Sequence, residues 1–141
     1  MLDDVLTDPV EMGIMVETAV YKHLASFYYR EKIKVGYFRK ASGNNKEIDV
    51  VVEFPHGKIF VEVKYRESAD ITPKDAIVEC IDDKTMGAII VTKNPVDFGV
   101  LPFDTRVPIM KIPAHAFLYL LGHAEKYSYL TKHSDDRLGL Y

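Results

Sequence analysis

The spacing of apolar and polar residues along the chain predicts a helix, a group of strands and two further helices. Near residues 9–31 apolar positions recur every three or four residues, Asp8 can cap a helix and Pro9 suits its first turn. Further along, short β-branched runs are typical of strands. The elements expected after the first helix are a strand at 34–39, a turn at 42–45, a hairpin at 47–64, a helix at 72–83, a buried strand at 87–92, an edge strand at 106–112 interrupted by Pro108, and a helix at 114–121. The order αβββαββα predicts an α/β fold.

The hairpin at residues 47–64 carries charged side chains within strands that are otherwise apolar. Charge in such a place is costly unless it is paired. Because strand side chains alternate between two faces, Ile48, Val50 and Val52 are expected on one face and Asp49 on the other. Asp49 therefore needs an explanation from the residues opposite it.

The register of the hairpin follows from the two apolar sets. They coincide when Val50 pairs with Val63, and a slip by one residue would separate them. In this register Asp49 lies opposite Lys64, and Glu62 lies on the diagonal, within about 7–8 Å at the backbone. The pattern predicts three charged groups on one face.

Two interpretations of these charges are open. The simpler one is a salt bridge between Asp49 and Lys64 on a solvated face, which is common but contributes little, and it leaves Glu62 without a role. The other is a site for Mg²⁺ or Mn²⁺, which two neighbouring carboxylates suit better than they suit zinc. Such an ion can polarise a phosphate, and a nearby ammonium can orient water or stabilise negative charge. The second interpretation indicates phosphodiester chemistry.

The first helix has a carboxylate on or beside its apolar face. Gly13, Ile14, Val20 and Tyr21 lie three or four positions from Glu17, where an unpaired charge is costly. Glu17 could equally lie at the margin of this face and reach water or a base. Both possibilities stay open.

Composition and charge set the outer limits. The chain has 141 residues, of which 48% are apolar and 28% charged, so it is about one domain long and can bury one core. The net charge of −3 conceals a basic stretch interleaved with aromatics, which could contact phosphates and stacked bases. A solvated helix end and edge strand is the simpler interpretation of that stretch. Its bases are Arg30, Lys32, Lys34, Arg39, Lys40 and Lys46.

Other classes of protein find little support. Cys80 is the only cysteine, which excludes an internal disulfide, and the chain lacks both a long apolar run and the basic start of a signal peptide. We therefore expect a cytoplasmic protein. Gly57-Lys58 lacks the upstream glycine of a phosphate loop, so ATP hydrolysis by this chain is not expected.

The hairpin and the first helix together resemble a known family. An acid in one strand, a short turn and Glu-x-Lys in the next strand, preceded by a helix bearing Glu, look like the PD-(D/E)XK nuclease superfamily. Its restriction-endonuclease-like αβββαβ core has a central mixed sheet flanked by helices, which matches the predicted order. The chain looks most like the nuclease-like domain at the C-terminal end of certain archaeal and bacterial AAA-type ATPases. The segments that carry this resemblance are Gly13-x-x-x-Glu17, Tyr37-Phe38-Arg39, Lys46-Glu47-Ile48-Asp49 and Val61-Glu62-Val63-Lys64, with Ile48 where the family signature has proline.

The resemblance implies roles for four residues. Asp49 and Glu62 would bind Mg²⁺ or Mn²⁺, Lys64 would position or activate water, and Glu17 would complete the acidic cluster. It also implies one nuclease-like domain at residues 1–124, with a polar tail or extension at 125–141.

The partners implied by the resemblance are DNA and an ATPase domain in cis or trans, without a membrane, and the domain could form a homodimer. The alternative is a catalytically inert module with a nuclease fold that serves protein assembly or nucleic-acid binding.

Overall fold

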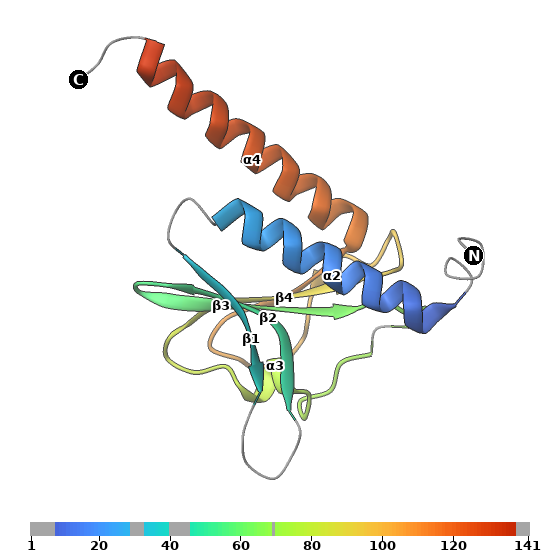
Figure 1. Ribbon diagram of the computed structural model, residues 1–141. Helices are drawn as coiled ribbons and strands as arrows, with labels where there is room; N and C mark the ends of the chain where they lie inside the picture. The colour runs from blue at the N-terminus through green and yellow to red at the C-terminus, as the bar shows by residue number, and fades with distance from the viewer. Residues whose placement is uncertain (1–7, 29–32, 40–45, 69, 138–141) are drawn as a thin grey trace.

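The computed structural model describes residues 8–28, 33–39, 46–68 and 70–137 (Figure 1). Its elements, in chain order, are α2 (Pro9–Tyr28), β1 (Lys34–Arg39), β2 (Glu47–Phe54), β3 (Gly57–Lys64), α3 (Ala76–Glu79), β4 (Thr85–Thr92), β5 (Gly99–Val100), β6 (Ile109–Pro113) and α4 (Ala114–Arg137). None of the helices in these ranges is both long and apolar enough to cross a membrane.

A six-stranded mixed sheet forms the centre of the fold, with the strand order β1-β2-β3-β4-β6-β5. The first three strands are antiparallel, β3, β4 and β6 are parallel, and β5 runs antiparallel to β6. The long helices α2 and α4 lie on one face of the sheet and the short helix α3 on the other (Figure 1). The expected α/β architecture, a mixed sheet flanked by helices, is confirmed.

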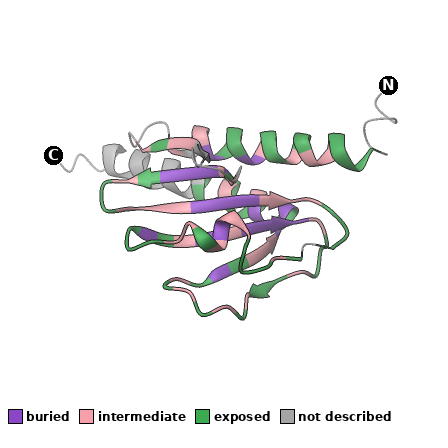
Figure 2. Ribbon diagram, turned by 90° about the horizontal axis from the view of Figure 1, so that it is seen from below, coloured by how far each residue is buried: buried purple, intermediate pink, exposed green. Residues whose placement is uncertain are grey.

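Two apolar cores lie on opposite faces of the sheet. Burying a large aliphatic side chain contributes about 1.5–3 kcal/mol, so both faces stabilise the fold. Buried residues concentrate on the middle strands (Figure 2). The α2/α4-side core consists of Val20, Leu24, Val50, Val52, Val61, Val91, Ala114 and Phe117. The α3-side core consists of Ile48, Val51, Phe60, Ile77, Ala88, Ile90 and Ile109.

The β2–β3 hairpin is tighter than the predicted one. Val50 pairs with Val61, and Phe54 pairs with Gly57, which leaves a turn of two residues. The predicted pairing of Val50 with Val63 is therefore wrong by two residues, because the strands stay paired right up to the turn. The difference is an even number, so it does not by itself move any side chain to the other face.

One extra residue in β2 changes the faces instead. Gly36 pairs with Val51 and Phe38 pairs with Ile48, so two steps along β1 match three steps along β2. Such a β-bulge interrupts the alternation of side chains. Ile48 consequently packs with Val51 in the α3-side core, whereas Val50 packs in the α2/α4-side core. The prediction that Ile48 and Val50 share a face is wrong for this reason.

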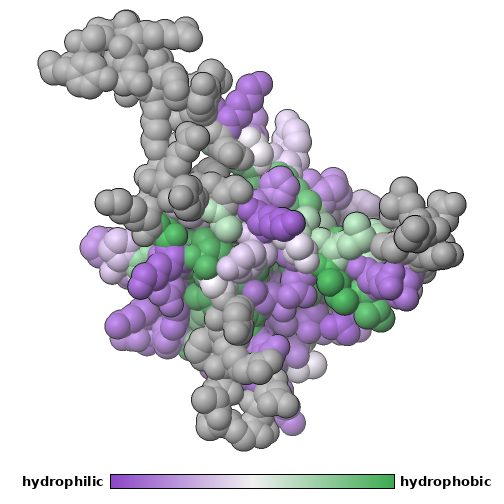
Figure 3. Space-filling model, viewed as in Figure 1, coloured by the Kyte–Doolittle hydropathy of each residue, from purple (hydrophilic) through white to green (hydrophobic). Residues whose placement is uncertain are grey.

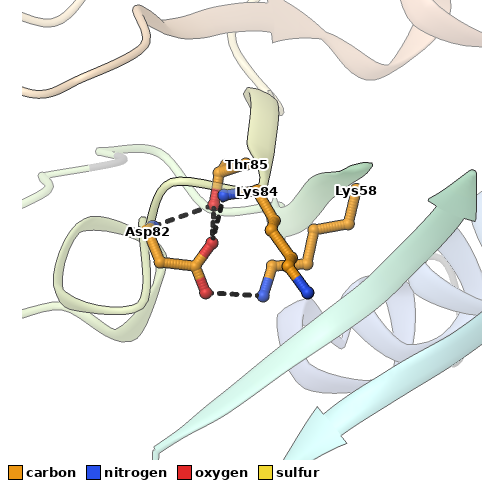
Figure 4. A network of polar contacts seen from close by, with 4 residues as sticks. All are labelled: Lys58, Asp82, Lys84 and Thr85. Carbon is orange, nitrogen blue, oxygen red and sulfur yellow. Dashed lines mark hydrogen bonds and ion pairs between the residues drawn. The ribbon is translucent and has the colours of Figure 1, made fainter. Parts of the chain in front are cut away.

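The helix expected at residues 72–83 is much shorter, because polar turns flank it on both sides. Before α3, the carboxylate of Asp75 accepts the N–H of Thr72 at 2.7 Å. After α3, the carboxylate of Asp82 accepts a hydrogen bond from the N–H of Lys84 at 2.9 Å (Figure 4). The same carboxylate forms an ion pair with the ammonium of Lys58 at 2.9 Å. These contacts turn the chain into β4 and leave only Ala76–Glu79 helical.

The ends of the chain follow the predictions in part. Asp8 caps α2 as expected, since its Oδ1 accepts the N–H of Val10 at 2.8 Å. α2 ends at Tyr28, and the rest of the predicted helix lies outside the described residues, as does the turn predicted at 42–45. α4 continues to Arg137 instead of ending near Leu121, so the predicted polar tail is helical over 125–137.

The strand predicted at 106–112 is β6, and it does not lie at the edge of the sheet. β5, where no strand was predicted, pairs with β6 and covers its outer side. Sequence patterns missed β5 because a strand of two exposed residues has no periodicity to detect.

Candidate functional site

The candidate site lies where the parallel strands end, and β3 supplies two of its groups. Phe60 packs in the α3-side core and Val61 in the α2/α4-side core, so alternation places Glu62 and Lys64 on the α3 side. Lys64 Nζ lies 3.3 Å from Glu62 Oε1. Lys64 thus forms its ion pair with Glu62, which is only 8% exposed, whereas the simpler interpretation paired Lys64 with Asp49 on a solvated face.

Asp49 reaches the site from the bulge in β2. Its Oδ2 accepts the N–H of Val63 at 2.7 Å, just beyond the last paired residues of the hairpin. With Glu17, Thr18 and Tyr21 of α2, Asp49 also lines a pocket of about 220 Å³. The bulge interrupts the face that was predicted to carry Asp49, Glu62 and Lys64. From the bulge Asp49 reaches the pocket beside α2, and it still lies near enough to Glu62 and Lys64 for their charges to interact.

Burial raises the pKa of the carboxylates at this site, and neighbouring acids add to each shift. The pKa of Glu62 is raised, first by burial and also by Asp49 and Asp75, although Lys64 opposes the shift. Burial is likewise the main reason why the pKa of Asp49 is raised, against the lowering by the Val63 N–H and Lys64. Each shift means that the folded protein holds a negative charge at this place less readily than water does. A bound cation would relieve all of these shifts.

Glu17 belongs to the same electrostatic cluster, although it is exposed on α2. Its pKa is raised by partial burial, then by Asp49 and by Glu47. Glu17 therefore lies at the margin of the apolar face, which was one of the two open interpretations. It is still close enough to Asp49 for the charge of Asp49 to raise its pKa. The structure brings together all four residues of the predicted site, with Asp49 between Glu17 on one side and Glu62 and Lys64 on the other.

The donors of this cluster suit a hydrated divalent ion better than a closed protein cage. Within the described residues, no group of three or more His, Cys, Asp or Glu side chains could hold a metal ion. Glu62 Oε2 is nevertheless buried and has no hydrogen-bond partner there. Mg²⁺ typically keeps several waters and binds proteins through one or two carboxylates, so Asp49 and Glu62 fit such an ion.

Of the residues predicted to bind nucleic acid, only Lys34 and Lys46 have side chains within the described structure. Lys34 is exposed at the start of β1, whereas Lys46 is half-buried, forms an ion pair with Glu79 and donates to the carbonyl of Lys74 at 2.9 Å. Lys46 thus connects the start of β2 to α3, which is a structural role. The side chain of Arg39 and the whole of Arg30, Lys32 and Lys40 lie outside what is described.

Sequence patterns missed two residues near the site. Glu47 raises the pKa of both Glu17 and Asp49, and its position two residues before Asp49 could have drawn attention to it. Thr92 ends β4 beside Lys64, its partner in the parallel pairing of β3 and β4. Finding Thr92 requires that pairing, which the apolar run of β4 alone does not reveal.

The comparison with protein families covers most of this structure. A family model described as "Domain of unknown function (DUF4143)" matches residues 12–112, which include every site residue described above. No curated protein matches the chain.

Proposed function

We propose that this chain, which belongs to the DUF4143 family, is a metal-dependent nuclease-type domain that hydrolyses DNA phosphodiester bonds. The observation that carries the proposal is Glu62, a buried carboxylate with an unpartnered oxygen, held 3.3 Å from Lys64 at the carboxyl end of a parallel strand. In open α/β sheets, ligands bind beyond this end of the strands. The arrangement favours a cation and a phosphate at the same place.

The proposed roles follow from the chemistry of each side chain. Asp49 and Glu62 would hold Mg²⁺ or Mn²⁺, which would polarise a phosphate and lower the pKa of a bound water. The ammonium of Lys64 can donate hydrogen bonds but cannot accept them. It would therefore orient water or stabilise the negative charge that develops on the phosphate. Glu17 would add negative charge beside Asp49 from α2.

A cleavage assay tests this proposal directly. With Mg²⁺ or Mn²⁺ and single-stranded, duplex or branched DNA, we expect Asp49→Asn and Lys64→Met to reduce the rate by about 10²–10⁴-fold, the usual contribution of a positioned acid–base group. Glu53→Gln is a matched control, since Glu53 is an exposed acid near the far end of β2. Unchanged rates in both site variants would remove the proposed roles.

The second candidate is an inert module for assembly with an ATPase or another copy of the chain. Domains of the DUF4143 family are commonly found in AAA-ATPase-associated proteins, which supports an ATPase partner in cis or in trans. Apolar side chains are exposed at the β5 edge of the sheet, with Val96 80%, Phe98 59% and Val100 63% exposed. Exposed apolar groups on an edge strand favour contact with another chain.

The last part of the proposal concerns nucleic-acid binding and the location of the protein. Lys34 is exposed, where its ammonium would contact a phosphate of bound DNA, and a solvated strand end explains this exposure equally well. A cytoplasmic setting and DNA as the bound polymer stay predictions.

A further inference from the structure

Two buried oxygens in this fold lack a hydrogen-bond partner among the described residues. They are Glu62 Oε2 and Thr92 Oγ1, and Thr92 is fully buried. Burying a polar atom without a partner is costly, so such atoms in native structures usually bind water, an ion or a ligand. The two atoms come from different strands, and their relative placement decides whether they serve one site.

Both atoms lie on the α3 side of adjacent strands. β3 and β4 are parallel, with Glu62 beside Ile90 and Lys64 beside Thr92. Ile90 packs in the α3-side core and Val91 in the α2/α4-side core, so alternation returns Thr92 to the α3 side. Neighbouring strands are about 4.8 Å apart, which makes Thr92 a direct neighbour of Lys64. Glu62, Lys64 and Thr92 thus form one polar group at the carboxyl ends of two parallel strands.

Glu62, Lys64 and Thr92 offer different hydrogen-bonding groups to a hydrated cation. A water bound to a cation directs its oxygen at the ion and must donate both of its hydrogens to acceptors. Lys64 has donors only, and one oxygen of Glu62 is already engaged by it. Thr92 Oγ1 is an unengaged acceptor within the group. Thr92 is therefore suited to hold a water of the ion rather than the ion itself.

We propose that Thr92 is a positioning residue of the Glu62–Lys64 site, whose hydroxyl accepts a hydrogen bond from a water of the divalent cation bound through Glu62 Oε2. This inference rests on the metal binding in the proposed function, but it does not require that the domain cuts DNA. Residues that orient the ligands of a metal from the outer shell typically change affinity or activity by about 10–100-fold.

A valine tests the role of the hydroxyl because it has nearly the same shape as threonine. In Mn²⁺ calorimetry on the full chain, we expect Thr92→Val to weaken binding about tenfold or more, and Thr92→Ser to stay within a few fold of wild type. In urea with EDTA, we expect the Val variant to unfold at the same midpoint or a higher one, because it removes an unpartnered buried hydroxyl. Thr92→Ala, which also lacks the hydroxyl, takes its place if the Val variant does not fold.

Thr85→Val is the matched control, a buried threonine at the other end of β4. Its Oγ1 accepts the N–H of Asp82 at 3.0 Å and lies 3.2 Å from Asp82 Oδ1, so its loss should lower the urea midpoint and leave Mn²⁺ affinity unchanged. A purely structural Thr92 would behave in the same way.

The outcomes separate this inference from the proposed function. Wild-type Mn²⁺ affinity in Thr92→Val overturns the inference, even when the wild-type chain cleaves DNA. Weakened Mn²⁺ binding in a chain that cleaves no DNA supports the inference and removes the nuclease. Absence of Mn²⁺ binding by the wild-type chain overturns both.

Discussion

At the scale of single residues, Asp49 is subject to opposing influences. Burial raises its pKa, and Glu47 adds to the effect, while the Val63 N–H and Lys64 lower it. The net shift is upward, so the folded protein keeps this carboxylate charged at a cost. The negative charge that the proposed metal site would need therefore lowers the stability of the fold at this residue.

The sign of the pH dependence follows from this shift. Because folding raises the pKa of Asp49 above its ordinary value of 3.8, the native state binds a proton more tightly than the unfolded chain does. The free energy of unfolding should then fall as pH rises from that ordinary value through the raised pKa. Asn cannot ionise and can still accept the Val63 N–H, so Asp49→Asn should gain stability over wild type as pH rises from 3.8 through the raised pKa.

Urea unfolding in EDTA at several pH values measures this gain. Glu53→Gln serves again as the control, since it removes an exposed charge from the same strand. A difference between Asp49→Asn and wild type that shrinks as pH rises above 3.8 would contradict the predicted sign.

At the scale of the elements, Gly57 allows the hairpin to approach β4. A Cβ on Gly57 would lie 2.6 Å from the carbonyl oxygen of Lys84 and 2.6 Å from Met86 Cγ. The carbonyl belongs to the backbone, where Lys58 N–H donates to it at 2.9 Å, so it cannot move aside cheaply. The tight turn of two residues thus depends on a residue without a side chain.

We expect Gly57→Ala to lower the free energy of unfolding by about 1–3 kcal/mol, the usual cost of overpacking. Gly13→Ala is the matched control, because Gly13 lies within α2 with nothing within 4 Å of the added Cβ. That change should stabilise the protein by about 0.5–1 kcal/mol, since alanine favours the helix. Chemical denaturation of the two variants measures both, and equal effects would show that the close approach costs nothing.

Local chemistry predicted some of these elements and not others. Asp8 and Pro9 marked the start of α2, and β-branched and aromatic residues marked β1 to β4, because these signals depend only on neighbouring residues. The bulge in β2 escaped detection because alternation assumes an unbroken strand. α3 was predicted too long because Asp75 and Asp82 hold turns through contacts that a helical pattern does not include.

At the scale of the whole molecule, the candidate site depends on the parallel pairing of β3 with β4. This pairing places Lys64 beside Thr92, although the two residues are 28 positions apart in the chain. Glu17, Asp49, Glu62 and Lys64 could be named from the sequence because a motif carries them. Thr92 could not, because its position follows only from the order of strands in the sheet.

The exposed apolar residues of the β5 edge give the last prediction. If the domain assembles through this edge, Val100→Lys should weaken self-association by about tenfold or more, as the loss of a central interface residue does. Val10→Lys is the comparison, because Val10 lies at the start of α2 and is 71% exposed. Apolar side chains gather on the surface at this end of α2 (Figure 3). Sedimentation equilibrium measures both variants. Weakening by Val10→Lys alone would assign assembly to α2, and unchanged association in both would exclude either surface.

The extra residue in β2 has a consequence at the level of the gene. Without the bulge, only one residue would lie between Ile48 and Val51, and its side chain would point toward α2. That single position could hold a valine for the core or a carboxylate for the pocket, but not both. One additional codon supplies both residues, because Val50 packs in the core while Asp49 lines the pocket. The pairing of β2 with β1 continues on both sides of the insertion, so an acidic group can be gained here without rebuilding the sheet.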